Sequence, residues 1–392
     1  MKHLQSIKDV NITGKKVFLR TDYNVVDDGK IIDEFRIEAT LPTIKYLLKH
    51  DCKIILASHN GRPEGKVVPS MSLEPVAKAL SDLLERPVQF VHDCIGKVAE
   101  DAASDLQPGE LVLLENLRFH SEEEANDPGF AKQLAHLADY YVDDAFANVH
   151  RKHASMVGVP KLLPAAAGLL VEREYDTLMG VLEEPKRPFL AIIAGAKVST
   201  KLDVLNNLLE RVDTLVIGGA MANTFLYARG YDMGKSVYEE GLTAQADEVL
   251  RAAHKKGVEV ILPTDLVVAA KPADGQRGRV VGLNQVGEHD MALDIGPESV
   301  DLINEAINEA KTVFWNGTVG FAELAEFARA SKAIAKHIAQ SDAKSIIGGG
   351  DTASFIDHEH MQRDFDFIST GGGASLELMA GKKLQALELL KG

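Results

Sequence analysis

Two glycine triplets near the C-terminus are the residues of this chain best suited to bind a phosphate. Each triplet follows a short apolar run and precedes a helix-like run: Gly348, Gly349 and Gly350, then Gly371, Gly372 and Gly373. Because glycine lacks a Cβ, it accepts positive φ and lets a phosphate approach the backbone. The free N–H groups of a helix start add roughly half a positive charge. One such turn is more often only a tight turn, but two together favour a phosphate ligand.

Arginines in the first half of the chain form a second candidate site. Most lie at or just beyond a predicted strand end: Arg20, Arg36, Arg62, Arg118 and Arg151. Ligands of doubly wound folds bind beyond the carboxyl ends of the strands, so we expect these side chains to converge. A guanidinium group binds phosphate or carboxylate oxygens with two parallel hydrogen bonds. The first half is therefore predicted to bind a small polyanion by side chains, and the second half a nucleotide by backbone.

The elements that position these residues are strands and helices in alternation. Continuous apolar runs predict buried strands at residues 17–19, 54–57, 111–114, 190–194, 214–217, 313–315 and 345–347. Segments of helical periodicity lie between them, which indicates an α/β protein with a doubly wound parallel sheet in each half. A long amphipathic helix over residues 167–184, stopped by Pro185 and Pro188, is predicted to join the halves.

Length and composition narrow the class of protein. A chain of 392 residues exceeds what one core usually supports, so two domains are expected. The net charge of −15 argues against a general nucleic-acid or membrane-surface binder. No apolar run approaches a membrane span and MKHLQSIKDV has no signal-peptide core, so we expect a cytoplasmic protein. Cys52 and Cys94 lack a ligand spacing, so they are predicted to be packed thiols rather than zinc ligands.

Several long motifs, in order, resemble the phosphoglycerate kinase family. In the first half these are VFLRTDYNV, DEFRIEATLPTI, SHNGRPEG, LLENLRF and DDAFANVHRKHAS. In the second half they include FWNGTVG, GGGDTASF and STGGGASLELMAGKKL. The resemblance covers nearly the whole chain and implies two Rossmann-like domains with a C-terminal segment that returns to the first. The implied division is 1–166 (phosphoglycerate binding), 167–188 (interdomain helix and linker), 189–378 (nucleotide binding) and 379–392 (returning segment).

The resemblance also implies a role for individual residues. Substrate-binding positions are Asp22, Tyr23, Asn24, Arg36, His59, Asn60, Gly61, Arg62, Arg118 and Arg151. Nucleotide-binding positions are Lys197, Lys201, Glu323, Gly349, Gly350, Asp351 and Thr352, and Asp351 is also the implied Mg²⁺ ligand. Lys197 and Lys201 are predicted to share one face of a helix start. Catalytic positions are Arg36 and Lys197, with Gly371, Gly372 and Gly373 as backbone donors.

Three positions depart from the family pattern. Val26 stands where the family commonly has proline, Asn60 replaces a usually apolar residue, and Thr318 replaces proline. None of the three removes a charged catalytic group. They affect the stiffness of the loops and the fit around the nucleotide.

The implied reaction is Mg²⁺-dependent phosphoryl transfer between 1,3-bisphosphoglycerate and ADP, giving 3-phosphoglycerate and ATP, by a monomer whose two domains close. The chain lacks a GxxxxGK[ST] loop and an HRD-type catalytic loop, which is consistent with catalysis by positioning and charge neutralisation. Two alternatives stay open. A nicotinamide-dependent dehydrogenase shares the fold but would need a GxGxxG fingerprint, which is missing. A non-catalytic paralogue would keep both half-sites, although Arg36 and Lys197 argue against it.

Overall fold

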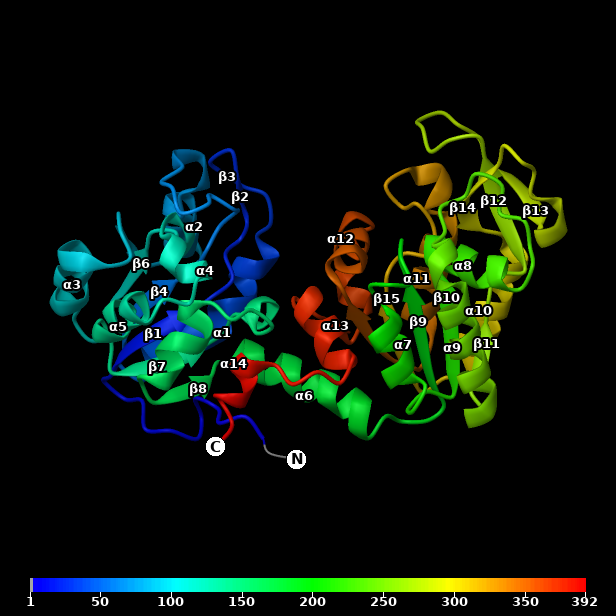
Figure 1. Cartoon of the computed structure of the whole chain (residues 1–392). Coiled ribbons are helices and arrows are strands. Elements are labelled where there is room, and N and C mark those ends of the chain that lie inside the picture. The colour runs from blue at the N-terminus through cyan, green and yellow to red at the C-terminus, as the bar shows by residue number, and fades with distance from the viewer. Residues whose placement is uncertain (1–2) are drawn as a thin grey trace. The chain divides into compact units, whose positions relative to one another are not determined.

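The structure is a computed structural model that describes residues 3–392. The chain divides into two compact units, labelled by element in Figure 1. Unit 1 comprises the residues up to Asp176 together with Lys383–Gly392, and unit 2 comprises Thr177–Lys382. The boundary falls inside helix α6 (Leu169–Glu183).

Unit 1 is built on a six-stranded sheet in which every pair of neighbours is parallel. The strand order is β5-β6-β4-β1-β7-β8. The strands are β1 (Lys16–Arg20), β4 (Lys53–Ala57), β5 (Gln89–Val91), β6 (Leu111–Leu114), β7 (Tyr140–Asp143) and β8 (Ala165–Ala167). A separate short hairpin pairs β2 (Val26–Asp27) with β3 (Lys30–Ile31). The central strands β1, β4 and β6 are buried almost throughout, which explains why their sequences are apolar without alternation.

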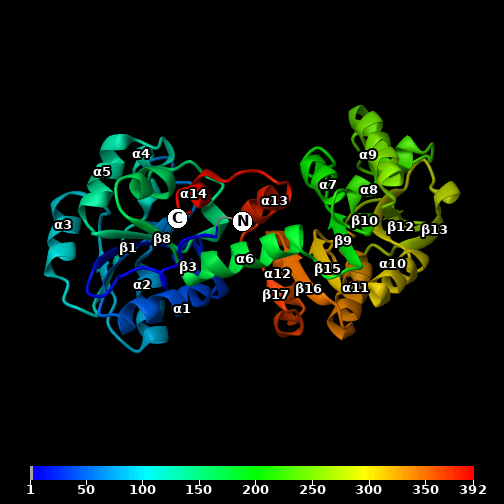
Figure 2. The same cartoon turned by 90° about the horizontal axis from the view of Figure 1, so that it is seen from below.

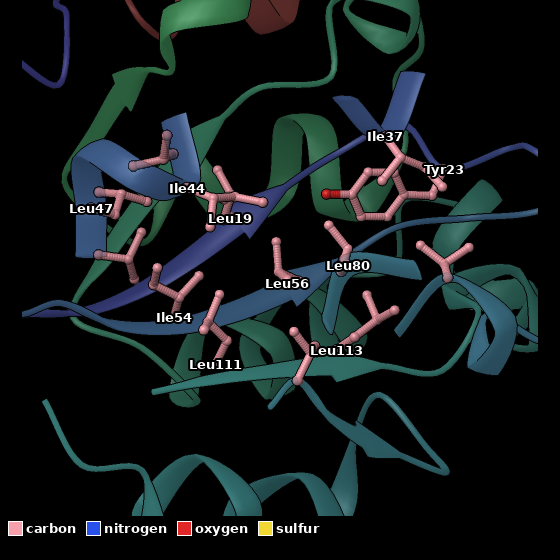
Figure 3. Packing of buried hydrophobic residues seen from close by; sticks show 14 of the residues in the cluster. Leu19, Tyr23, Ile37, Ile44, Leu47, Ile54, Leu56, Leu80, Leu111 and Leu113 are labelled. Atoms are coloured by element: carbon pink, nitrogen blue, oxygen red, sulfur yellow. The ribbon is translucent and has the colours of Figure 1, made fainter. Parts of the chain in front are cut away.

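Helices cover both faces of this sheet, as Figure 2 shows. Helices α1 (Phe35–Lys49) and α2 (Glu74–Leu84) pack on one face and enclose a core with β1, β4 and β6 (Figure 3). The other helices of unit 1 are α3 (Gly96–Asp105), α4 (Ser121–Glu124), α5 (Pro128–His136) and the C-terminal α14 (Gln385–Glu388). Single turns lie at η1 (Pro69–Met71), η2 (Leu117–Phe119), η3 (Phe146–Asn148), η4 (Ala154–Gly158) and η5 (Val159–Lys161). Gln5 N–H donates to the Leu390 carbonyl, which ties the C-terminal segment to the start of the chain.

Unit 2 has a second six-stranded parallel sheet, in the order β11-β10-β9-β15-β16-β17. Its strands are β9 (Phe189–Ala194), β10 (Thr214–Gly218), β11 (Glu259–Ile261), β15 (Thr312–Asn316), β16 (Lys344–Gly348) and β17 (Phe367–Ile368). This is the order of a Rossmann fold, whose topological switch point lies between β9 and β15. An additional antiparallel sheet pairs β12 (Asp265–Ala269) with β13 (Arg279–Gly282) and β14 (Met291–Ile295).

Helices lie on both faces of the second sheet as well (Figure 2). They are α7 (Leu202–Leu208), α8 (Ala220–Ala228), α9 (Thr243–Lys256), α10 (Pro297–Glu309), α11 (Arg329–Gln340), α12 (Gly350–His358) and α13 (Gly373–Met379). Single turns lie at η6 (Glu240–Leu242), η7 (Leu283–Gln285), η8 (Ala325–Phe327) and η9 (Gln362–Asp364). A core cluster joins β9 and β15 to α10, α11 and α12, with Trp315 fully buried.

The predicted fold class is confirmed, because each unit contains a parallel sheet with helices on both faces. All seven predicted strands fall within observed strands, and α6 lies within the predicted helical stretch. The antiparallel sheet of unit 2 was not predicted, although β12 contains the apolar run at residues 266–269. No helix within residues 3–392 combines the length and apolar character that a membrane span needs.

Candidate active site

The carboxyl ends of β1, β4, β6 and β7 bring the polar loops of unit 1 together. β1 lies between β4 and β7, and β4 lies between β1 and β6, so the segments that follow these strands emerge at one edge of the sheet. We call the resulting cluster the anion pocket. Its members are Asp22, Asn24, Arg36, His59, Arg62, Arg118 and Arg151.

Asp22 and Arg36 form the tightest ion pair of the anion pocket. Arg36 Nη1 lies 2.5 Å from Asp22 Oδ2, and Arg36 Nε lies 3.5 Å from Asp33 Oδ2. Asp22 Oδ1 is buried and accepts no hydrogen bond from the described residues. Asp22 thus orients Arg36 with one oxygen and leaves the other for a donor such as a hydroxyl.

Arg118 and Arg151 carry donors without acceptors. Arg118 Nη1 donates to the Gly61 carbonyl at 2.7 Å, and its Nε lies 3.2 Å from Glu124 Oε1. Arg118 Nη2 and Arg151 Nε have no hydrogen-bond partner within residues 3–392. Burial, together with the positive charge of Arg151, lowers the pKa of Arg118 to about 10. A bound anion would satisfy these donors and relieve the repulsion between the two guanidinium groups.

His59 is neutral in this environment. Its side chain is buried, and its Nδ1 lies 3.3 Å from Arg20 Nη2. Burial and the charges of Arg20 and Arg118 lower the pKa of His59 well below its ordinary value. The 3.8 Å approach of its Nδ1 to Asp22 is therefore not an ion pair at neutral pH.

A buried network supports the pocket from below. Arg20 is fully buried and donates through Nε to Ser155 Oγ at 2.8 Å. Ser155 donates in turn to Glu123, from its N–H at 2.9 Å and from its Oγ at 2.5 Å. His153 lies beside this group, and burial, with Arg118 next in effect, lowers its pKa to about 3. Sequence reasoning missed Ser155, Glu123 and His153, although His153 belongs to the motif VHRKHAS that follows β7.

Unit 2 contains a cavity of about 690 Å³ at the switch point of its sheet. The cavity lies beyond the carboxyl ends of β9, β15 and β16. Its polar lining includes Lys197, Lys201, Asn316, Glu323, Gly349, Gly350, Asp351, Thr352, Gly372 and Gly373. Its apolar lining includes Leu266, Pro272, Leu293, Val319 and Phe321. One cavity thus offers both cationic groups and an apolar surface, as a nucleotide requires.

Lys201 and Asn316 join two of the strand ends that line the cavity. Lys201 Nζ donates to Asn316 Oδ1, and burial lowers the pKa of Lys201 to about 8. Asn316 Nδ2 is buried and has no acceptor among the described residues. A phosphate oxygen would supply that acceptor.

The first glycine triplet brings backbone close to Asn316. Gly349 has φ +91° and precedes α12, and a Cβ added there would lie 2.5 Å from Asn316 Nδ2. Gly350 is exposed at the helix start, and an added Cβ would meet nothing within 4 Å. The Asp351 side chain is exposed at the cavity, and its negative charge acts on Lys201. Its carboxylate is therefore open to a cation.

Comparisons with known proteins cover almost the whole chain. The family described as phosphoglycerate kinase matches residues 7–382. A phosphoglycerate kinase of Moorella thermoacetica is 50% identical over 386 residues, 98% of each chain. One of Dictyoglomus turgidum is 44% identical over 392 residues, 100% of this chain and 99% of its own. This chain belongs to the phosphoglycerate kinase family.

Solved structures agree with this membership. The structure of phosphoglycerate kinase from Coxiella burnetii has a TM-score of 0.89 at 37% identity, covering 99% of this chain and 98% of that one. The phosphoglycerate kinase from Pyrococcus horikoshii OT3 has a TM-score of 0.86 at 33% identity, with the same coverage.

Tyr23 needs a correction relative to the family-based prediction. Its side chain is fully buried in the hydrophobic core beside Ile37 and Leu80 (Figure 3), and its hydroxyl lies 2.8 Å from Thr40 Oγ1. Burial raises its pKa strongly. Only the backbone of Tyr23 is left for a ligand, because the chain turns this side chain inward directly after β1.

Two further predictions about unit 2 are corrected. Gly371 is buried, does not line the cavity, and donates its N–H to Ser369 Oγ at 3.0 Å, so it is no outward donor. Gly372 and Gly373 do line the cavity. Lys197 and Lys201 do not share a helix face, because α7 begins only at Leu202 and both lysines precede it. They reach the cavity from the loop after β9.

The remaining predicted residues of unit 2 have mixed surroundings. Glu323 is exposed in a turn that lines the cavity. Thr352 Oγ1 is buried and accepts from the Gly317 N–H at 2.6 Å. Asp294, which sequence reasoning missed, lines the cavity and accepts from Ile295 and Ala330 N–H groups. Burial raises its pKa to about 7. A sequence signal was present, because Asp294 is the first residue of DIGPES, a segment that resembles the family.

Two of the three departures from the family pattern contact each other. Val26 N–H donates to Asn60 Oδ1 at 3.1 Å, and Asn60 Nδ2 donates to the Val26 carbonyl at 2.9 Å. A proline at position 26 would lack this N–H, and an apolar residue at position 60 would need no such partner. The Asn60 side chain therefore stabilises the hairpin. Thr318 Oγ1 bonds the Gly320 carbonyl at 3.0 Å within its own turn.

Gly61 and Asn24 hold the adjoining loop of unit 1. Gly61 has φ +63° and donates its N–H to Asn24 Oδ1 at 2.8 Å. Arg62 follows Gly61 and is exposed. The pKa of Arg151 is lowered mainly by the burial of Arg151, and the positive charge of Arg62 lowers it further. The charged residues among the predicted substrate-binding positions thus lie in one cluster, and the side chains of Tyr23 and Asn60 make contacts within the fold.

Proposed function

We propose that this protein catalyses reversible phosphoryl transfer between 1,3-bisphosphoglycerate and ADP, giving 3-phosphoglycerate and ATP. The observation that carries the proposal is that each unit holds buried donors that find no acceptor among residues 3–392. They are Arg118 Nη2 and Arg151 Nε in unit 1 and Asn316 Nδ2 in unit 2. Both sets suit phosphate oxygens. Membership of the family supports the same reaction.

The anion pocket is proposed to bind 3-phosphoglycerate. Arg118, with Arg62 and Arg151, would bind the phosphate that is not transferred. Asp22 Oδ1, which lacks a donor, would accept the substrate hydroxyl. Asn24 and His59 would complete the pocket, His59 as a neutral group because its pKa is strongly lowered.

The cavity of unit 2 is proposed to bind the nucleotide. Lys201 and the N–H groups of Gly349 and Gly350 would hold its phosphates, and Thr352 would support that loop through Gly317. Glu323 would bind the ribose. The base would pack at the apolar end of the cavity beside Leu293 and Phe321.

Chemistry at the reacting atoms needs no general base. In the direction that consumes ATP, a substrate carboxylate oxygen attacks the γ-phosphorus, a new P–O bond forms, and the bond to the β-phosphate oxygen breaks to release ADP. The nucleophile is ionised at neutral pH, so no proton is transferred. Arg36 and Lys197, with the N–H groups of Gly372 and Gly373, would neutralise the charge on the transferring group.

The residues of the cavity fit a magnesium ion. Asp351 offers an exposed carboxylate at the cavity, close enough to Lys201 to act on it electrostatically. Mg²⁺ is commonly bound by one or two carboxylates together with substrate phosphates. When bound, the ion would supply positive charge to the nucleotide phosphates. Asp351→Asn should weaken Mg-ADP binding and spare 3-phosphoglycerate binding, each measured by calorimetry. Equal loss of both affinities would argue against the assignment.

We further propose that the enzyme is a cytoplasmic monomer whose units close around the two substrates. Direct transfer requires the reacting atoms to come within roughly 3 to 3.5 Å. The hinge would involve residues 167–184 and 369–373. Small-angle scattering should show full compaction only with both substrates and Mg²⁺, and partial compaction with either alone. An active sample without compaction would contradict this.

The decisive test of activity is ATP-dependent formation of an acyl phosphate from 3-phosphoglycerate. Hydroxylamine trapping of the product detects the mixed anhydride directly. Wild type should form it and Arg36→Ala should not. Tight binding of both substrates without product would favour the non-catalytic paralogue instead. The dehydrogenase alternative is not favoured by the family membership.

A further inference from the structure

Three side chains with metal-ligating atoms meet in unit 1, in a place to which the proposed reaction assigns no role. Asp93 and Cys94 lie between β5 and α3, and His120 lies between η2 and α4. One ligand atom of each lies within 4.8 Å of the other two. In the described part of the chain, no other group of three or more such residues comes this close.

The contacts of this cluster hold two of its members in place. His120 Nε2 lies 2.8 Å from Asp93 Oδ1, which also accepts from the Cys94 N–H at 2.7 Å. The His120 ring packs 5.4 Å from the ring of Phe130, centroid to centroid. The Asp93 and His120 side chains are 42% and 27% exposed, whereas Cys94 is 1% exposed. The cluster is therefore open to solvent on the Asp93 and His120 side, with the thiol beneath.

Three carboxylates, those of Asp93, Glu115 and Glu123, lie close enough to Cys94 to act on it electrostatically. Their negative charge favours a divalent cation at this place.

We propose that Asp93, Cys94 and His120 bind a zinc ion through one carboxylate oxygen, one thiolate and one imidazole nitrogen. This mixed O, S and N set matches the ligands that zinc takes in proteins, and solvent on the open side supplies the fourth ligand. Zinc–ligand bonds of about 2.0 to 2.3 Å put tetrahedral ligand atoms about 3.3 to 3.8 Å apart. The observed spacing of up to 4.8 Å needs only small side-chain shifts to match this. On binding, the Cys94 S–H bond breaks and its proton leaves to solvent. The hydrogen bond between His120 Nε2 and Asp93 Oδ1 opens as the imidazole proton moves to Nδ1, and the Zn–S, Zn–N and Zn–O bonds form.

Cobalt(II) provides the direct test, because a thiolate bound to Co²⁺ gives a charge-transfer absorption that carboxylate and imidazole ligands do not give. Full-length protein is stripped with a chelator and titrated with Co²⁺, and then with Zn²⁺. We expect one equivalent of Co²⁺ to produce the band and Zn²⁺ to abolish it by displacement. No band at saturating Co²⁺ overturns the proposal.

Two cysteine variants assign the band. Cys94→Ala should lose it, and Cys52→Ala should keep it, because Cys52 is an equally buried thiol whose Sγ donates to the Ile12 carbonyl. A band that survives Cys94→Ala, or disappears in Cys52→Ala, overturns the assignment. His120→Gln, at a partly exposed position, tests the site without emptying the core. It should weaken Co²⁺ binding about tenfold or more, and unchanged affinity would contradict the predicted ligand set.

Discussion

The anion pocket of unit 1 and the cavity of unit 2 are proposed to bind phosphate oxygens through different parts of the chain. In unit 1 the donors are guanidinium groups held by other side chains, as Arg36 is held by Asp22 and Arg20 by Ser155. In unit 2 many donors are backbone N–H groups at glycine turns, supported by Lys201 and Asn316. The two halves therefore respond to different kinds of substitution.

This difference follows from what each half is proposed to recognise. A small, highly charged acid offers few atoms, so long side chains must converge on it from several strand ends. A nucleotide spans a cavity of about 690 Å³ and brings its phosphates to one helix start, where backbone groups already point outward. Removal of a charged side chain should therefore weaken ligand binding most in unit 1. Addition of a Cβ at a glycine should weaken ligand binding most in unit 2.

The largest effect is expected from Arg36→Ala. Turnover should fall by about 10³- to 10⁵-fold, because Arg36 is proposed to neutralise charge in the transition state. ATP binding should be nearly unchanged, because Arg36 belongs to unit 1. Steady-state kinetics and calorimetric titration with ATP measure the two quantities. Arg36→Lys keeps the positive charge but lacks the planar guanidinium group. Its turnover should therefore lie between that of the wild type and that of Arg36→Ala. Near-normal turnover of Arg36→Ala would contradict the proposed role of Arg36 in the transition state.

Arg118→Ala should mainly raise KM for 3-phosphoglycerate, by about ten- to hundredfold, because hydrogen bonds to a charged group contribute about 1.5 to 3 kcal/mol. A group that binds ground and transition states alike leaves kcat nearly constant. Arg86→Ala is a matched control, because Arg86 Nη1 also donates to a glycine carbonyl, that of Gly109, at 2.9 Å. An unchanged KM for Arg118→Ala would count against its role.

Gly349→Ala should weaken ADP binding by about tenfold or more, because it places a Cβ against Asn316 Nδ2 at φ +91°. Gly350→Ala, one residue later, should have little effect, because its added Cβ meets nothing within 4 Å. Calorimetry with ADP and with 3-phosphoglycerate separates the half-sites. Equal effects of the two alanines would contradict the proposed backbone recognition.

Lys201 should make ADP binding depend on pH. Its pKa is lowered to about 8 by burial, so it carries its positive charge below that pH and loses it above. Affinity for ADP should fall up to about tenfold between pH 7 and about 9, and Lys201→Arg should remove this dependence. The affinity for 3-phosphoglycerate, which is proposed to bind at Arg118, should stay unaffected over the same pH range. A pH profile that is identical in Lys201→Arg would exclude Lys201 as its cause.

The smallest effect on catalysis is expected from Asn60→Leu, which should instead lower stability by about 1 to 3 kcal/mol. The substitution leaves the Val26 N–H and carbonyl without their partner. The double variant Val26→Pro with Asn60→Leu should be less destabilised than the sum of the single variants, with a coupling of about 0.5 to 3 kcal/mol. Urea denaturation of the wild type, the two single variants and the double variant measures the four free energies of unfolding that this comparison needs. Strict additivity would show that the two departures are independent.

The sequence alone determined the local elements of both units. The apolar run at residues 345–347 predicted a strand, and the glycines at residues 371–373 predicted a turn. Both signals lie in residues that are neighbours in the chain. The end of α9 at Gly257, which has φ +71°, likewise depends on one residue type. Such features depend on short-range sterics and hydrogen bonding, which the chain carries wherever it is placed.

Only the tertiary structure decided which distant residues meet. The strand order of unit 1 places Arg118 near Arg151 and sets Asn60 against Val26, and neither contact has a signature in sequence spacing. The same order brings His120 to Cys94 across 26 positions, although neither belongs to a metal-ligand motif. Local sequence fixes where each strand ends, but the pairing of strands depends on burying apolar faces of the whole sheet, and that pairing decides which ends converge.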